Sequence, residues 1–269
     1  MASETTSLMQ YRDLLWNLVA RDLKIRYRGS VLGFLWTILN PLFMAAIYII
    51  FLRLLAGRGA RINNEEIIIG VFAWQFTVQC VNAGMCSITG NTCLVKKVYF
   101  PRLILPLSTT LSNLVNFYLT VVVQWGLIIA LLGLRHESMA LTFLWTPIFA
   151  LYHLGFNLGL SLLVASVNVF YRDTQYVVNL LLSAWFFLTP VMYPLSMIHD
   201  ALKTHPWLES LYMANPLSVI IVAYRAQHLA TVTFPWSIGA WIGLALPVLI
   251  LVAAWALFQR TERHFSDIL

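Results

Sequence analysis

Charged side chains are scarce in this sequence, and cations gather beside aromatic rings. Of the 269 residues, 60% are hydrophobic and only 10% are charged. One such group combines three cations with two aromatics and a proline: Lys96, Lys97, Tyr99, Phe100, Pro101 and Arg102. No charge occurs in the stretches on either side, 67–88 and 103–134. Aromatics and arginine favour docking of another protein, but the same cations also suit lipid headgroups, so both interpretations stay open.

Catalytic and metal-binding motifs are missing from the sequence. It contains no Gly–Lys pair, which excludes the phosphate-binding GxxxxGK[ST] loop of an ATPase. HExxH, GxSxG and paired catalytic carboxylates are also absent. His136 and Glu137 are adjacent, but nothing completes a metal site around them. We therefore expect no catalytic residue, no metal site and no cofactor bound by this chain.

Six uncharged segments account for most of the chain. They are residues 31–52, 67–88, 103–134, 140–170, 174–198 and 230–258. Each reaches the roughly 20 residues that a helix needs to cross about 30 Å of hydrocarbon. Backbone groups in lipid must be bonded internally, so helices are expected rather than an open sheet. The sequence predicts an all-α integral membrane protein with six spans.

The basic residues predict the orientation of these spans. Most of the 17 Lys and Arg lie before the first span, between the second and third, and after the sixth. Positive residues near span ends mark the cytoplasmic side. Both termini are therefore expected in the cytoplasm.

The apolar stretch 211–224 does not fit the six-span count. It is interrupted by Asn215 and Pro216 and is too short to span. A seventh span would also move the basic residues after it to the outside. We expect the region from Pro190 to about residue 230 to enter the outer leaflet and return. Pro190 and Pro194 should end the fifth helix, because proline removes a donor and clashes with the preceding turn.

An amphipathic helix is predicted before the first span. Apolar residues recur there at helical spacing, opposite a polar and basic face. Such helices lie in the membrane interface beside anionic headgroups. Asp22 is placed to pair with Arg26 one turn later. A surface anchor without a protein partner would show the same pattern.

The spans carry neutral polar residues only. They are Asn40, Gln75, Gln79, Asn82, Asn113, Asn116, Gln124, His153, Asn157 and Asn168. Hydrogen bonding between helices is the default role of such residues. Proton- or ion-coupled transporters usually need an intramembrane ionisable residue. We expect no buried Asp, Glu, Lys or Arg, and therefore an energy source outside this chain.

Two further groups of residues carry expectations. Arg172 and Asp173, after the fourth span, are expected to pair with each other or with the N-terminal helix. Aromatic rings stack on sugar faces, so an uncharged aromatic path within the spans would suit a sliding polysaccharide. The candidates for this path are Phe34, Trp36, Trp74, Phe76, Phe186 and Phe187.

Four motifs occur in one order along the chain: RDLKIRYRGSVLGFLWTILNPL (21–42), LVKKVYFPRLILPLS (94–108), VFYRD (169–173), and LTPVMYP followed by NPL (188–194 and 215–217). Together they resemble the membrane subunit of ABC-2-type polysaccharide exporters, which move O-antigen, capsule or teichoic-acid chains. The resemblance covers essentially the whole chain. It implies a homodimer in the bacterial inner membrane, with two ABC ATPase subunits that hold ATP and Mg. Membrane lipid and an undecaprenyl-linked polysaccharide are implied as partners, and nucleic acid is not.

The resemblance also divides the chain into functional segments. Residues 1–30 would be a cytoplasmic interface helix, 31–260 the transmembrane domain and 261–269 a short cytoplasmic tail. A coupling helix at about 92–103 would contact the ATPase through the six residues from Lys96 to Arg102 named above. The interface-helix residues are Arg21, Asp22, Lys24, Arg26, Tyr27 and Arg28. An external gate at about 194–229, with the turn before it, would use Pro190, Met192, Tyr193, Pro194, Asn215 and Pro216.

Alternatives remain open on the sequence. Arg26, Arg28, Lys96 and Lys97 could steer a lipid pyrophosphate, although docking competes for the same charges. Within the family, a capsule, teichoic-acid or small-molecule exporter is possible, but uncharged spans favour a neutral glycan over an anionic chain. A membrane-embedded transferase acting on lipid-linked sugars would need catalytic acids, which the spans do not supply.

Overall fold

The computed structural model describes residues 10–30, 32–56, 63–201 and 206–265. These residues form helices and no named β-strand. The α-helices are α2 (Arg12–Tyr27), α3 (Leu35–Ala56), α4 (Asn64–Met85), α5 (Thr92–Lys97), α6 (Ile104–Gly133), α7 (Thr146–Phe170), α8 (Thr174–Phe187), α9 (Leu195–Ala201), α10 (Pro206–Met213), α11 (Pro216–His228) and α12 (Ile238–Thr261). Three short 3₁₀ helices are η1 (Thr89–Asn91), η2 (Leu141–Trp145) and η3 (Glu262–His264). The all-α class is confirmed.

Five helical segments of the described chain are long and apolar enough to cross a membrane. They are Leu35–Leu55, Asn64–Met85, Ile104–Gly133, Leu141–Phe170 and Ile238–His264. The remaining expected span, 174–198, forms α8, which ends at Phe187 after 14 residues. It ends before Pro190 and Pro194, as expected from the two prolines. A sixth span is therefore not confirmed.

The core is built around α4. This helix contacts α3, α6, α7, α8 and α11. Of its apolar stretch 72% is buried, against 17% of the apolar stretch of α3. Two glycines on α4 allow this close packing. A Cβ on Gly84 would lie 2.4 Å from Ser161 on α7, and one on Gly70 would lie 2.4 Å from the carbonyl oxygen of Val191. Small residues let helices approach closely where lipid provides no hydrophobic drive.

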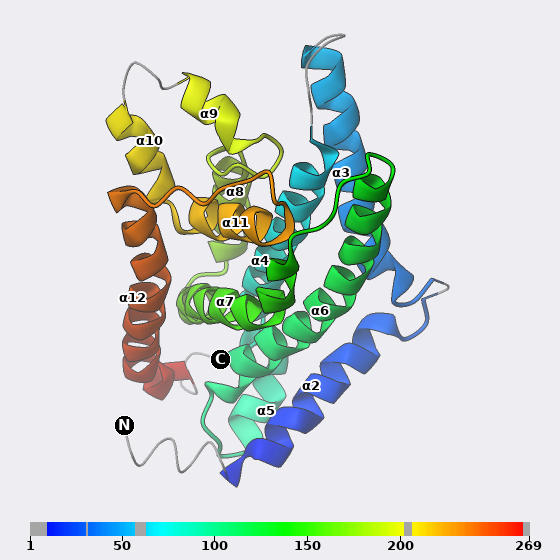
Figure 1. Cartoon of the computed structure of the whole chain (residues 1–269). Helices are drawn as coiled ribbons and strands as arrows, with labels where there is room; N and C mark the ends of the chain where they lie inside the picture. The colour runs from blue at the N-terminus through cyan, green and yellow to red at the C-terminus, as the bar shows by residue number, and fades with distance from the viewer. Residues whose placement is uncertain (1–9, 31, 57–62, 202–205, 266–269) are drawn as a thin grey trace.

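The segments with predicted functions lie at opposite ends of the helix bundle (Figure 1). At one end lie α2, α5 and the last turns of α12. At the other end lie α9 and α10, above α11. The basic segments predicted to share one side of the membrane therefore share one end of the molecule.

The expectation of no buried ionisable residue is wrong. Glu65, Glu66 and Arg225 lie outside the uncharged segments predicted to span, yet they are only 2%, 5% and 0% exposed. The second span begins at Asn64 rather than at residue 67, so it takes in both glutamates. Acidic residues are favourable in the first turn of a helix, where unpaired N–H groups point. The network around Arg225 is described below.

Candidate functional site

The aromatic and cationic cluster forms a short helix followed by a turn. Helix α5 stops at Lys97, and Val98 takes an extended conformation. Phe100 is buried in a cluster that includes Leu18 of α2 and Phe258 of α12. Its neighbour Tyr99 is 98% exposed. Phe100 thus anchors the turn to the protein, while Tyr99 projects into the surroundings.

The three cations of this turn differ in what they contact. Arg102 donates a hydrogen bond to the backbone carbonyl of Glu262, just after α12. Lys96 and Lys97 are exposed and pair with no acid among the described residues. They border a hollow of about 870 Å³ between the turn and the end of α12, where Arg263 also lies. One cation is therefore structural and two are available to a partner.

Helix α2 is fixed to the membrane helices by its last turns. Arg21 pairs with Asp22 at 2.9 Å, whereas Arg26 donates to the side chain of Asn113 on α6 at 2.7 Å. The expected pair between Asp22 and Arg26 is therefore wrong, because a neighbouring arginine and a buried amide compete for them. The Tyr27 hydroxyl donates to Asn116 at 2.5 Å.

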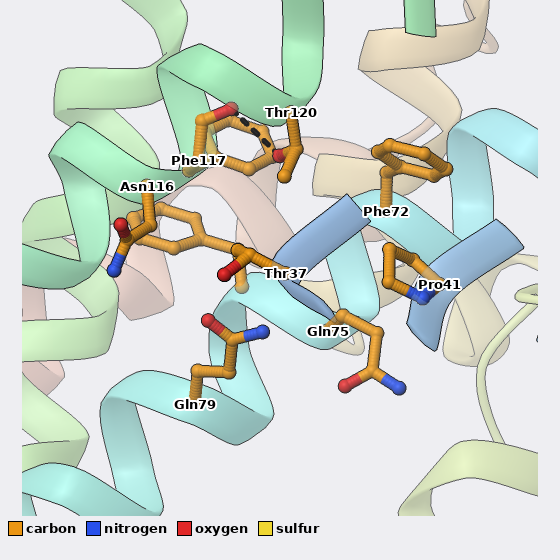
Figure 2. Close-up of a pocket in the computed structure, with 9 residues that line it drawn as sticks. Thr37, Pro41, Phe72, Gln75, Gln79, Asn116, Phe117 and Thr120 are labelled. Atoms are coloured by element: carbon orange, nitrogen blue, oxygen red, sulfur yellow. Dashed lines mark hydrogen bonds between the residues drawn. The ribbon is translucent and has the colours of Figure 1, made fainter. Parts of the chain in front are cut away.

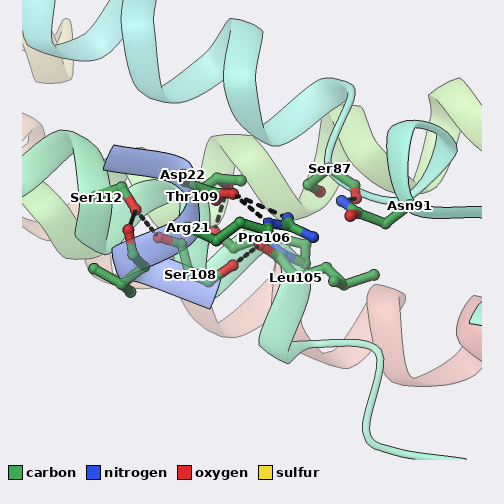
Figure 3. Close-up of polar contacts among 10 residues, drawn as sticks. Arg21, Asp22, Ser87, Asn91, Leu105, Pro106, Ser108, Thr109 and Ser112 are labelled. Carbon is green, nitrogen blue, oxygen red and sulfur yellow. Dashed lines mark hydrogen bonds and ion pairs between the residues drawn. The ribbon is translucent and has the colours of Figure 1, made fainter. Parts of the chain in front are cut away.

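A polar hollow of about 310 Å³ lies where α2 meets the end of α4 and the start of α6. Asp22, Ser87 and Asn91 line it (Figure 3). The other two interface-helix cations, Lys24 and Arg28, are exposed and unpaired with any described acid. Of the four residues proposed to steer a pyrophosphate, only Arg26 is held by a protein side chain. Arg28, Lys96 and Lys97 remain free.

A groove of about 570 Å³ runs between α3, α4 and α8. Trp74, Phe186 and Phe187 line it, together with Met192 from the turn after α8. The Trp74 and Phe186 rings meet edge to face, with centroids 5.5 Å apart. No Asp, Glu, Lys, Arg or His is among the residues that line the groove. An uncharged aromatic surface therefore exists, and it ends next to the proposed gate.

Asn215 ties the turn after α8 to the start of α11. Its side-chain oxygen caps α11 by accepting from the Leu217 N–H at 3.2 Å and also accepts from the Trp185 indole at 3.0 Å. Its amide nitrogen donates to the carbonyl of Leu188 and the hydroxyl of Thr189, both at 3.1 Å. One side chain thus joins α8, its turn and α11.

Arg225 makes a second tie to the same turn. Its guanidinium donates to the carbonyls of Pro190, Val191 and Tyr193, at 2.6, 3.1 and 3.0 Å. It also donates to the Glu66 carbonyl at 3.0 Å and lies 3.8 Å from the Glu66 carboxylate. A buried charge is tolerated only when it is paired and fully hydrogen-bonded. Arg225 therefore clamps α11, the turn and α4 together.

The turn is also fixed at its far side by two tyrosines. The hydroxyls of Tyr193 and Tyr212 lie 2.9 Å apart, and Tyr193 donates to the Phe187 carbonyl at 2.9 Å. Burial raises the pKa of both phenols. Both are therefore neutral at physiological pH and act as hydrogen-bonding groups.

Comparison with known proteins decides the family. The sequence profile described as ABC-2 type transporter matches residues 13–229. This chain belongs to the ABC-2 type transporter family. It is 34% identical over 265 residues to a Myxococcus xanthus protein named O-antigen export system permease protein RfbA, covering 97% of this chain and 96% of the relative. Two Klebsiella pneumoniae proteins of the same name are 30% and 29% identical, covering 96% of this chain and 95% of each relative. With its five apolar helices, it is a multi-pass membrane protein of a transporter.

The predicted aromatic path of this ABC-2 transporter chain is only partly assembled. Three of its six candidates, Trp74, Phe186 and Phe187, line the groove. Phe76 instead stacks on Phe117 in the core, with centroids 4.4 Å apart. The other two do not line the groove: Phe34 packs on the Tyr27 ring and Trp36 is exposed on α3.

The remaining predicted residues are the gate residues and the expected ion pair after α7. Met192 and Tyr193 lie in the turn held by Arg225, and Asn215 and Pro216 begin α11. The expected ion pair of Arg172 and Asp173 is wrong: both are exposed, and neither pairs with a charged group among the described residues. They sit in the turn between α7 and α8, where solvent competes for both charges.

Sequence reasoning missed Arg225, which makes four hydrogen bonds to backbone carbonyls of α4 and of the turn after α8. The sequence does mark this residue, because Arg225 is a charge directly after the apolar stretch that begins at Pro216. A charge in such a stretch marks either a loop or a buried pair, and only the fold separates the two. Glu66, its partner, lies 159 residues away in sequence.

Proposed function

We propose that this chain is the transmembrane subunit of an ATP-driven exporter that moves lipid-linked polysaccharide of O-antigen type out of the cytoplasm. The observation that carries the proposal is similarity along nearly the whole chain to three proteins named as O-antigen export permeases. The uncharged aromatic groove supports it, because such a surface suits sugar faces and holds no charge for an ion.

ATP and Mg would be bound by a separate ATPase subunit, two copies of which dock on the cytoplasmic end. The docking surface we propose is the α5 turn with α2, acting as coupling and interface helices. Tyr99 supports this, since an almost fully exposed aromatic is typical of a protein contact. Lys96 and Lys97 supply two free cations beside it. Both termini would then be cytoplasmic, and α9 to α11 would form the external gate in the outer leaflet of the bacterial inner membrane.

Two copies of the chain would form the path for the undecaprenyl-linked glycan. The groove is open along α3 and α8, both of which expose large apolar side chains. A second copy facing this side would enclose it. The short helix α8, continued by the turn and gate, would complete the sixth crossing.

The alternatives are less well supported. A capsule exporter fits the same features, but an anionic teichoic chain would find no cation in the groove. A membrane-embedded transferase would need free acids. Glu65 and Glu66 are buried, but they lie beside Arg135 at 3.6 Å and Arg225 at 3.8 Å.

Reconstitution with the ATPase subunit proposed as its partner tests the proposal. In vesicles, Lys96→Glu combined with Lys97→Glu should abolish ATPase association and ATP-driven export, because an acidic patch replaces the free cations. Arg53→Glu is the control, because Arg53 is an exposed cation at the last turn of α3, at the opposite end. Unchanged assembly and export in the double variant would contradict the docking assignment. Failure of the wild-type complex to move any glycan would contradict the function.

A further inference from the structure

Two glutamines on α4 lack the partners that a membrane helix normally provides. Gln75 and Gln79 are half-buried one turn apart. Neither side chain hydrogen-bonds to another of the described residues. An amide without a partner is costly in hydrocarbon, and a polar membrane residue that bonds to no neighbouring helix usually faces a wet cavity or a ligand. Their surroundings therefore indicate what each one meets.

Gln79 faces a space that is too small for a ligand. It extends toward Thr37 in a pocket between α3, α4 and α6 (Figure 2). The free volume there is about 10 Å³, room for one water at most. Gln75 borders this pocket too, but its amide extends in a different direction (Figure 2). Gln75, unlike Gln79, also lines the groove of about 570 Å³.

Across the groove, α8 presents matching polar groups. Asn179 and Ser183 are exposed one turn apart, and both line the groove. The Ser183 hydroxyl donates to the backbone carbonyl of Asn179 at 2.8 Å, which leaves its oxygen free to accept. The Asn179 amide has no hydrogen-bond partner among the described residues. Both walls of the groove therefore offer unused hydrogen-bonding groups.

The chemistry of the occupant follows from this combination. Amides donate and accept hydrogen bonds without carrying charge. Lipid tails would leave them unsatisfied, and an ion would find no opposite charge in the groove. Sugar hydroxyls donate and accept in the same way, and sugar C–H faces stack on rings such as Trp74 and Phe186. A neutral sugar unit matches the polar and aromatic walls together.

We propose that Gln75 and Asn179 form a hydrogen-bonding subsite for the hydroxyls of a neutral glycan, with Ser183 as a further acceptor. This rests on the proposed export function and names its substrate class. The glycan is recognised by its hydroxyl groups while it passes the aromatic walls. The groove offers no cation to balance an anionic chain, so an uncharged sugar chain fits this subsite better.

Substitution by leucine tests the subsite, because leucine removes the amide but suits a membrane helix. The probe is the lipid-linked glycan that accumulates in cells lacking this chain. The measurement is the glycan concentration that half-maximally stimulates the reconstituted ATPase complex. Gln75→Leu and Asn179→Leu should each raise it about fivefold, the effect of one lost hydrogen bond. Gln79→Leu is the matched control and should leave it unchanged.

A second measurement changes the glycan as well as the protein. O-methylation of the glycan removes its donors, so wild-type complex should lose stimulation by the methylated form. In Gln75→Leu, methylation of the glycan should reduce ATPase stimulation much less than it does in the wild type. A purely structural role of Gln75 would not make the effect of methylation depend on this side chain. Equal stimulation of the wild type by both forms would overturn the proposal. So would Gln75→Leu and Asn179→Leu variants that match Gln79→Leu. A wild-type complex that responds to no glycan would instead contradict the export function itself.

Discussion

At the scale of single residues, Arg225 has the largest structural role in the region from α8 to α11. It is fully buried and donates to four backbone carbonyls of α4 and the turn after α8. The Glu66 carboxylate nearby compensates part of its charge and also accepts from Asn63 at 2.8 Å. Because the fork of donors spans several acceptors, a lysine would not replace it.

We predict that Arg225→Gln destabilises the protein by about 3–5 kcal/mol, the typical cost of removing one partner of a buried ion pair. The change leaves Glu66 and several carbonyls without their donors. Thermal unfolding of the purified complex in detergent is the measurement. Arg21→Gln is the control: Arg21 and its partner Asp22 have side chains that are 40% and 20% exposed, so the loss should stay below about 1 kcal/mol. Equal losses in the two variants would refute the clamp.

Sequence alone could not predict this clamp. The apolar stretches predicted the long helices, because segments of this length and composition can cross a membrane only as helices. Arg225 and Glu66 carry the opposite signal, since charged residues are normally assigned to loops. Only contacts between residues far apart in sequence show that the two charges satisfy one another. The same limit applies to Arg26: it bonds Asn113, 87 residues away in sequence, which leaves Asp22 to pair with Arg21.

At the scale of elements, the α5 turn divides its two aromatics between different tasks. The sequence predicted an aromatic and cationic docking segment, and the structure adds that only one ring faces outward. Phe100 packs in the cluster that joins α2, α5, α7 and α12, whereas Tyr99 contacts almost nothing.

Alanine substitutions should therefore separate stability from docking. Phe100→Ala should lower stability by about 3–5 kcal/mol, as for other buried phenylalanines. Tyr99→Ala should change stability by less than about 0.5 kcal/mol, because the side chain is exposed, yet weaken ATPase association at least tenfold. Unfolding curves and titration of the ATPase against the reconstituted chain measure the two effects. Wild-type affinity in Tyr99→Ala would exclude the turn as the ATPase contact.

For α8, the sequence predicts the end of the helix but not the conformation of the residues that follow it. Pro190 and Pro194 correctly predicted where its helix stops, because proline acts locally. The conformation of the residues that follow depends on contacts with residues far away in sequence. Their turn folds back on α11 through Asn215 and Arg225, so α8 remains short.

At the scale of the whole molecule, the face that carries the groove between α3, α4 and α8 differs from the other apolar faces. Composition predicted a membrane protein, but it could not say which apolar faces meet lipid and which meet protein. The structure narrows this choice, because the polar side chains of Asn179 and Ser183 lie on the exposed side of α8. Lipid contact would leave both poorly satisfied.

We therefore predict that two copies approach each other along α8. In a chain whose three native cysteines are replaced, Leu180→Cys should form covalent dimers with a short bifunctional thiol reagent in vesicles. Val122→Cys on α6 is the matched control: the two positions are 71% and 61% exposed, so both thiols are accessible. A dimer interface along α8 brings only the first pair within reach of the reagent. Equal yields from the two positions, or dimers from Val122→Cys alone, would place the second copy elsewhere and leave the groove open to lipid.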